Sequence, residues 1–306
     1  MGNVSERKRC EMNKEIDNKI RSITKEINKD SANVELILER ARLYEQVQDY
    51  NKCVKDYELA LNIDGDNAEI YLKMGIICEK DASVCVDGFW KKEEKYDEAY
   101  DYYSKAIDLS RDNKKLYIHR GNLLRDVFEE DEEALEDYLR AYKIDNKDYV
   151  VCKLIAETYY LIDDSENSIR FYKKVIEMNK EDVSSIEAIA DIYQELEEYE
   201  EAIQYYNRII DKVDNTYSIC FDIGICYFRL KDYKKALNQL EQCNVSQRDY
   251  IYYFIKGEIY EELGKYNDAL IEYDKSLSLK EEAAIRDKKE VILNKLEGMK
   301  SDGKDK

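Results

Sequence analysis

Proline is absent from the sequence, and only ten of its 306 residues are glycine. Because these residue types are the usual helix breakers, their scarcity favours uninterrupted helices. Helix formers such as Glu, Lys and Leu are common, and 44% of the residues are hydrophobic, which is enough for a substantial core. The composition predicts an all-α protein.

Catalytic signatures are absent as well. The single histidine, His119, has no serine, cysteine or carboxylate at a spacing typical of an active site, so we expect a surface residue. The glycines form neither G-x-x-x-x-G-K nor G-x-G-x-x-G, the patterns of phosphate-binding loops. The sequence predicts a protein that is not an enzyme and needs no cofactor, with an unrecognised hydrolase as a remote alternative.

Basic residues are in deficit, since 49 Lys and Arg face 68 Asp and Glu, for a formal net charge of -19. Such a charge repels the phosphates of nucleic acids and anionic lipid headgroups. No apolar run approaches the roughly 20 residues that cross a bilayer, and the amino terminus lacks the apolar core of a signal peptide. We expect a cytoplasmic protein with neutral or basic protein partners, and neither nucleic acid nor membrane as a partner.

Metal-ligand patterns are missing too. The eight cysteines include no C-x-x-C pair and no regular spacing with histidine. An acidic stretch at residues 129–133 lacks the alternating ligands and the glycine of a calcium-binding loop. We therefore expect no metal site, and we expect most cysteines to be compact core residues.

What the sequence does contain is a repeat. Small residues recur at separations of 34, 46, 35, 34, 34 and 33, each followed three positions later by a ring or an apolar group. They are Ala41, Gly75, Gly121, Ala156, Ala190, Gly224 and Gly257. A second register moves with the first: Cys53, Ala99, Ala134, Ser168, Ala202, Ala236 and Ala269. This pattern predicts a pair of amphipathic helices, written seven times.

Large side chains stand four positions after each residue of the second register: Tyr57, Tyr103, Tyr138, Tyr172, Tyr206, Leu240 and Tyr273. A small residue in the first helix lets the second helix approach closely, and the large residue beside it fills the adjoining space. This packing accounts for the abundance of tyrosine, whose ring can be buried while its hydroxyl reaches water.

The period, the G-x-x-Y element of the first helix and the Y-x-x-A-x-x-x-Y-x-x-A element of the second resemble the tetratricopeptide repeat. The closest segments are YDEAYDYYSKA at residues 96–106 and YEEAIQYYNRI at residues 199–209. The resemblance covers residues 34–283 and implies an α-solenoid, a right-handed superhelix of about seven helix hairpins. Polar clusters at residues 64–67, 145–148 and 214–215 replace the proline common between repeats, and their Asp and Asn can cap the next helix.

The domain organisation follows from these registers. We place the repeats at 34–67, 68–113, 114–148, 149–182, 183–216, 217–249 and 250–283. An insertion at about 81–95 accounts for the 46-residue step, and Phe89 and Trp90 within it either pack on the repeat edge or contact a partner. The single extra residue of the third repeat falls, by this alignment, in the acidic turn at 129–133.

Flanking segments complete the chain. Residues 1–33 hold a polar segment and a helix with one apolar face, formed by Met12, Ile16, Ile20, Ile23 and Ile27. This face predicts either a cap on the first repeat or a dimer contact. Residues 284–300 form a similar capping helix with Ile285, Ile292 and Leu296, and residues 301–306 form a disordered tail.

The family resemblance implies that first helices line a concave groove. In the last four repeats it places there Leu154, Glu157, Tyr160, Glu187, Asp191, Phe221, Asp222, Phe228, Phe254 and Glu258. Some residues of this face can instead pack against the capping helix. The mixture of acidic and aromatic groups favours a peptide or helix that carries basic and apolar side chains. We therefore expect a protein-binding scaffold or adaptor, with a self-associating homo-oligomer as the alternative.

Overall fold

A computed structural model describes residues 2–302 except 84, 87–88, 91–92, 214–215 and 244. The chain divides into two compact units, Met1–Asp164 and Ser165–Lys306. The elements of unit 1 are α1 (Gly2–Ile27), α2 (Val34–Gln46), α3 (Tyr50–Asp64), α4 (Ala68–Ala82), β1 (Cys85–Val86), β2 (Phe89–Trp90), α5 (Glu93–Leu109), α6 (Lys114–Leu123), η1 (Leu124–Phe128), α7 (Asp131–Ile144) and α8 (Tyr149–Leu161). Those of unit 2 are α9 (Ser165–Met178), α10 (Val183–Glu195), α11 (Tyr199–Asn207), η2 (Ile210–Lys212), α12 (Tyr217–Arg229), α13 (Tyr233–Gln242), η3 (Val245–Gln247), α14 (Tyr250–Glu262), α15 (Tyr266–Leu279) and α16 (Ala283–Asp302).

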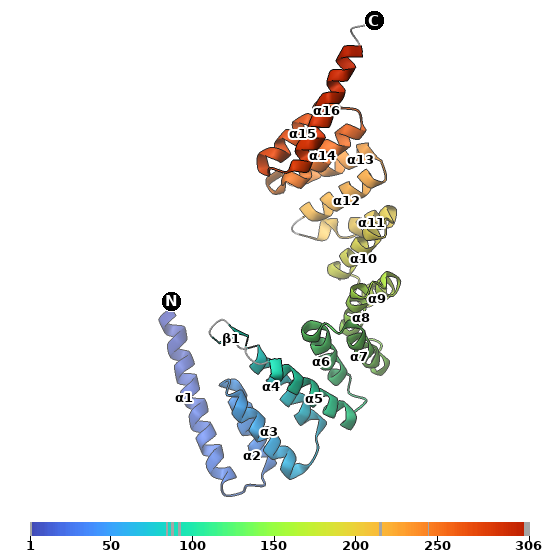
Figure 1. The fold of residues 1–306 in the computed structure, drawn as a ribbon. Helices are drawn as coiled ribbons and strands as arrows, with labels where there is room; N and C mark the ends of the chain where they lie inside the picture. Colours follow the sequence, from blue (N-terminus) through green and yellow to red (C-terminus); the bar gives the residue numbers. More distant parts are fainter. Residues whose placement is uncertain are drawn as a thin grey trace. The chain divides into compact units, whose positions relative to one another are not determined.

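Each unit is a stack of helix hairpins (Figure 1). In unit 1 the closest pairs are α2 with α3, α4 with α5 and α6 with α7, and in unit 2 they are α10 with α11, α12 with α13 and α14 with α15. Successive hairpins also pack on each other within their unit, as α3 does on α4 and α11 on α12. The predicted all-α solenoid is confirmed.

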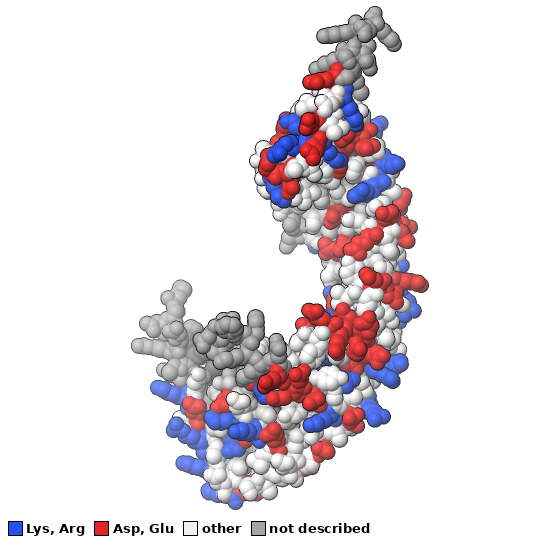
Figure 2. Space-filling view, viewed as in Figure 1, with Lys and Arg blue, Asp and Glu red and all other residues white. Residues whose placement is uncertain are grey.

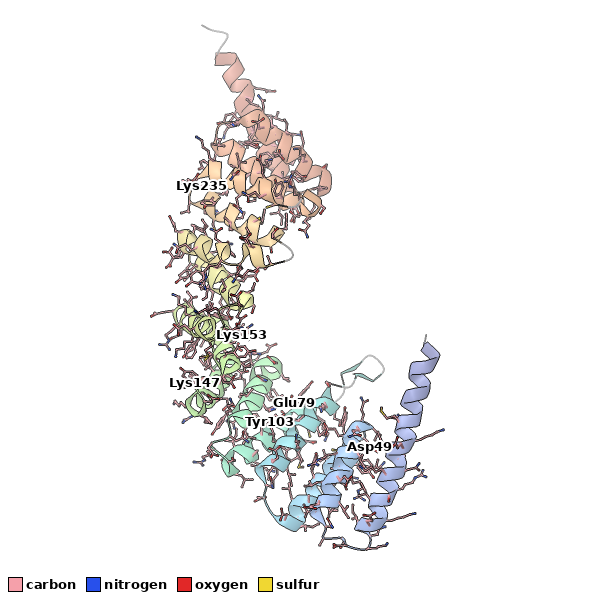
Figure 3. All side chains as sticks on the ribbon, turned by 180° about the vertical axis from the view of Figure 1, so that it is seen from behind. Asp49, Glu79, Tyr103, Lys147, Lys153 and Lys235 are labelled. Carbon is pink, nitrogen blue, oxygen red and sulfur yellow. The ribbon has the colours of Figure 1, made fainter. Side chains whose placement is uncertain are left out.

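Close packing of small on large side chains holds the hairpins together. A Cβ built on Gly75 would lie 2.4 Å from Cε1 of Tyr103, and one built on Gly121 would lie 2.7 Å from Cε1 of Tyr138. The Tyr103 hydroxyl donates a hydrogen bond to the carboxylate of Glu79, across the same hairpin (Figure 3). The predicted pairing is confirmed, because no side chain larger than glycine fits under these rings.

Ion pairs also recur at fixed positions of the repeat, which we call the charged register and which the sequence analysis did not predict. They join the residue before the small one in a first helix to the third residue after the small one in the second. The pairs are Arg40 with Asp56, Arg120 with Asp137 and Lys256 with Glu272. Nε and Nη2 of Arg120 each donate to Asp137 at 2.8 Å, and the Asp137 side chain is only 5% exposed.

Turns between hairpins use the expected caps. The side chains of Asn67 and Asp148 accept hydrogen bonds from backbone N–H groups in the first turns of α4 and α8. The cluster at 214–215 lies outside the described residues. We predicted that the extra residue of the third repeat lies in the acidic turn at 129–133. It lies instead in the π-helical turn η1, whose wider hydrogen-bonding pattern accommodates one more residue.

The insertion between α4 and α5 contains two short antiparallel strands. Cys85 pairs with Trp90 and Val86 with Phe89. The side chains of Phe89 and Trp90 lie outside the described residues, so their contact with a partner stays a prediction.

The helices at the two ends bury apolar faces on the neighbouring hairpins. On α1, Ile20, Ile23 and Ile27 belong to the core formed with α2, α3 and α4. On α16, Ile285 and Ile292 pack with the core of α15. Six cysteines whose side chains the structure describes are buried, as expected of core residues: Cys53, Cys78, Cys152, Cys220, Cys226 and Cys243.

Candidate functional site

Three of the ten residues predicted for the groove lie on α8 in unit 1. Glu157 is half-buried and accepts from Nη1 of Arg125 at 3.3 Å, Tyr160 is 39% exposed, and Leu154 is half-buried. The other seven residues lie on α10, α12 and α14 in unit 2.

Carboxylates of α10 and α12 form a cluster in unit 2. Glu187 and Asp191 stand one helical turn apart on α10, and both are close enough to Asp222 of α12 for their charges to act on it. We call these three residues the acidic face. Figure 2 shows further Asp and Glu side chains on the visible surface around α10 and α11.

The members of the acidic face differ in their partners. The Tyr206 hydroxyl of α11 donates to Oδ1 of Asp191 at 2.6 Å. Within the described part of the chain, neither Glu187 nor Asp222 has a hydrogen bond or an ion pair. Burial, and then the charges of Asp191 and Glu187, raise the pKa of Asp222 to about 7. Burial and the charge of Asp191 also raise the pKa of Glu187. Two carboxylates here are therefore without a counter-charge.

The two phenylalanines predicted for the groove on α12 are half-buried. The ring of Phe221 stacks on Tyr217, with 6.0 Å between centroids and 10° between planes. Phe228 packs on Tyr233 at a centroid distance of 6.1 Å. Both phenylalanines pack against the core that contains Leu240, so part of each ring is used inside the fold.

The two predicted residues of α14 lie against α16. Phe254 packs on Tyr273 at a centroid distance of 5.9 Å and belongs to the core that includes Ile285. Nζ of Lys288, on α16, lies 5.4 Å from the centre of the Phe254 ring and forms an ion pair with Glu258. The family resemblance placed Phe254 and Glu258 in the groove. It gave no information on the path of α16, the helix that follows the repeats.

Family models match several parts of the sequence. The tetratricopeptide repeat model matches residues 34–67 and 250–282, and the model of anaphase-promoting complex, cyclosome, subunit 3 matches residues 162–243. Together with the helix hairpins, these matches identify the family of the chain. The chain is a tetratricopeptide repeat (TPR) protein. No curated protein matches its sequence.

Solved structures share the fold of this TPR protein. A tetratricopeptide repeat protein from Parabacteroides merdae ATCC 43184 has 16% sequence identity and a TM-score of 0.53, covering 85% of this chain and 98% of its own. YrrB, described as a TPR protein with an unusual peptide-binding site, has 20% identity and a TM-score of 0.51, covering 60% and 94%. The structure of Naa15/Naa10 bound to HypK-THB has 13% identity and a TM-score of 0.60, covering 85% of this chain and 39% of the matched chain.

His119 of this TPR protein, which we expected at the surface, is half-buried. Its ring stacks on Tyr103, with 5.6 Å between centroids and 24° between planes, and burial lowers its pKa.

Among the described residues, no group of three His, Cys, Asp or Glu side chains is placed to hold a metal ion. No helix within the described ranges is long and apolar enough to cross a membrane.

The raised pKa of Asp222 gives the TPR protein a pH-dependent stability. The folded protein holds a proton here up to a pH of about 7, whereas the unfolded chain releases it near the ordinary value of 3.8. Stability therefore falls as the pH rises between these values. We expect Asp222→Asn to increase the free energy of unfolding by about 1–2 kcal/mol at pH 8, and by progressively less toward pH 4.

Urea denaturation at pH 8, 6 and 4 measures this difference. Glu200→Gln, at an exposed carboxylate of α11, is the matched control and should change stability little at any pH. A gain for Asp222→Asn that is constant across the three pH values would contradict the assignment of a raised pKa.

Proposed function

We propose that this chain is a non-catalytic protein-interaction scaffold and that its acidic face binds a basic, partly apolar segment of a partner protein. The observation that carries the proposal is the pair of carboxylates, Glu187 and Asp222, that have no counter-charge in the described part of unit 2. A lysine or arginine of a partner supplies that charge. It would relieve the repulsion among the three carboxylates and return Asp222 to its ionised form.

The residues around the acidic face suit a peptide rather than an isolated cation. Phe221 and Phe228 are half-buried on α12, the helix that carries Asp222, so their exposed parts offer apolar area on the same helix. Apolar burial with a few charged contacts is the usual composition of a peptide-recognition surface. The fold also supports the proposal, because it brings Glu187 and Asp191 of the first helix α10 close to Asp222 of the next first helix, α12.

Self-association through the amino-terminal helix has less support. Ile20, Ile23 and Ile27 of α1 are buried against α2, α3 and α4 of the same chain. Most of the face that predicted a dimer contact is thus used within one molecule, whereas Met12 on the same face is 55% exposed.

A capture experiment with a charge-neutralised variant tests the proposal. The immobilised full chain is incubated with lysate, bound proteins are identified by mass spectrometry, and the affinity of the most enriched partner is then measured. We expect the variant Glu187→Gln/Asp222→Asn to bind this partner about tenfold or more weakly, because both changes remove charge while preserving side-chain shape.

The control is Glu200→Gln/Glu201→Gln, which removes the same number of charges from exposed positions of α11. It should leave the affinity within about twofold of the wild type. Equal loss in both variants would show that only the net charge matters, and unchanged binding in both would place the partner elsewhere.

A further inference from the structure

Three basic side chains line a pocket in unit 1 of this acidic molecule. Its volume is about 450 Å³, and its lining residues are Arg111, Tyr117, Arg140, Lys143 and Ile144. Arg111 lies in the turn between α5 and α6, Tyr117 on α6, and the other three on α7. We call this the basic pocket. It belongs to unit 1, whereas the acidic face belongs to unit 2, and it carries the opposite charge.

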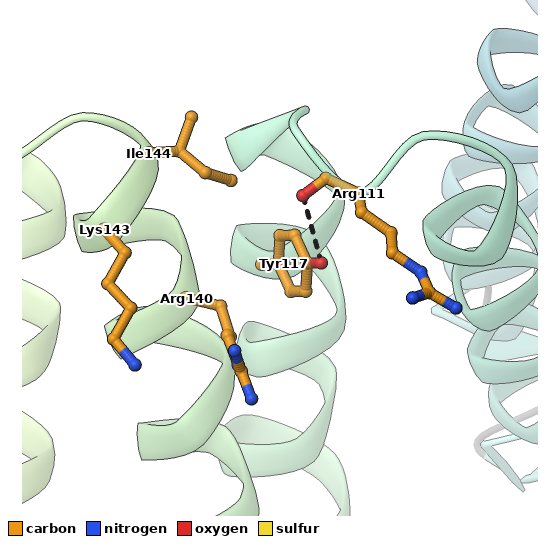
Figure 4. Close-up of a pocket in the computed structure, with 5 residues that line it drawn as sticks. All are labelled: Arg111, Tyr117, Arg140, Lys143 and Ile144. Carbon is orange, nitrogen blue, oxygen red and sulfur yellow. Dashed lines mark hydrogen bonds between the residues drawn. The ribbon is translucent and has the colours of Figure 1, made fainter.

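The architecture of the basic pocket is shown in Figure 4. The Tyr117 ring lies between Arg111 on one side and Arg140 and Lys143 on the other. Its hydroxyl donates to the backbone carbonyl of Arg111 at 3.2 Å, which ties the turn to α6. Tyr117 is only 8% exposed, whereas Ile144 is 40% exposed. The buried Tyr117 is therefore held in place and Ile144 adds exposed apolar surface, while the three cations line the same pocket.

The three cations of the pocket lack acidic partners. Within the described residues, Arg111, Arg140 and Lys143 form no ion pair, although every one of them is exposed. The acidic residues nearest to them in sequence are engaged elsewhere. Asp112 accepts from the Ser110 hydroxyl at 3.2 Å, and Asp145 accepts from Nζ of Lys114 at 2.6 Å.

Three other cavities of the described residues have carboxylates in their walls, among them Glu98, Asp232 and Glu130 respectively. Lys143 lies in the last turn of α7, where a cation also stabilises the helix dipole. That effect does not account for Arg111, which comes from a different segment and lines the same pocket.

We infer that the basic pocket binds an acidic segment of a polypeptide, with carboxylate or phosphate groups contacting Arg111, Arg140 and Lys143. Guanidinium groups bind the oxygens of such anions through paired hydrogen bonds. Cations on both sides of Tyr117 suit a ligand with successive anionic side chains better than a single anion. Nucleic acid is disfavoured, since its long run of phosphates would meet the surrounding negative charge of a chain with net charge -19.

Fluorescence anisotropy with the full chain tests this inference. The probes are a labelled decapeptide with four glutamates, the same peptide with two of them replaced by phosphoserine, an all-glutamine version, and an oligonucleotide of equal charge. We expect both anionic peptides to bind and the glutamine version not to bind. Arg140→Gln/Lys143→Gln should weaken binding of the anionic peptides about tenfold or more.

Lys55→Gln/Lys73→Gln is the control, because it removes the same charge from exposed positions of unit 1. It should change the affinity by less than about twofold. Arg111→Gln, in a turn outside the helices, gives a second variant if the α7 pair fails to fold. Equal loss in the pocket and control variants, no binding of either anionic peptide, or a pocket-dependent preference for the oligonucleotide would each overturn the inference. The ratio between the two anionic peptides shows whether carboxylate or phosphate is the preferred group.

Discussion

Asp137→Ala should lower the free energy of unfolding by about 3–5 kcal/mol. Asp137 accepts two hydrogen bonds from Arg120, and its side chain is 5% exposed. Arg120 is 21% exposed and also donates to the hydroxyl of Ser104 at 3.0 Å. Without Asp137, this guanidinium keeps its charge in a half-buried position and loses its counter-charge. Urea denaturation at pH 7 measures the loss.

Replacing both partners should cost much less than breaking the pair. Arg120→Met/Asp137→Leu should stay within about 1 kcal/mol of the wild type, because an apolar pair of similar size needs no desolvation of charge. The chain itself offers a precedent, since Met74 and Tyr102 occupy these register positions in the second repeat. A double variant as unstable as Asp137→Ala would show that the site requires the ion pair itself.

These ion pairs mark a limit of what the sequence predicted. The registers of small and large residues were readable because they recur in all seven repeats. The charged register is occupied by ion pairs in only three repeats, so a search for one recurring residue type passes over it. Opposite charges at the same two positions, Arg40 with Asp56 and Arg120 with Asp137, were the signal that could have revealed it.

The candidate site was predicted with similar limits. Period and resemblance placed Glu187, Asp191 and Asp222 on first helices, and the structure brings their charges together. They did not predict that α16 would lie against Phe254 and Glu258, because a helix beyond the last repeat follows no repeat register. The basic pocket was missed for a related reason. Its cations come from a turn and from a second helix, whereas the predicted groove used first helices alone.

Gly75→Leu is expected to destabilise unit 1 by about 3 kcal/mol or more, at the upper end of overpacking effects. The first added carbon would already lie 2.4 Å from Cε1 of Tyr103, whose side chain is fully buried. The ring has little freedom to move, because its hydroxyl is hydrogen-bonded to Glu79 and its face stacks on His119. Lys73→Leu, on the exposed face of α4, should change stability by no more than about 0.5 kcal/mol.

A double-mutant cycle separates steric conflict from a general intolerance of leucine. Tyr103→Ala alone should cost about 3–5 kcal/mol through the cavity it leaves. In Gly75→Leu/Tyr103→Ala the new side chain occupies part of that cavity, so the combined loss should be at least about 2 kcal/mol smaller than the sum of the single losses. Additive losses would mean that Gly75 is needed for the backbone and not for the approach of Tyr103.

The place of the damage tests the solenoid itself. Because a hairpin in a solenoid is stabilised by its own packing and by its immediate neighbours, Gly75→Leu should act locally. Hydrogen exchange should therefore become faster in α3, α4, α5 and α6, which contact the altered hairpin or belong to it. Protection in α14 and α15 should be unchanged. Uniform acceleration along the whole chain would show that the repeats unfold as one cooperative body, in which case single-repeat free energies could not be assigned.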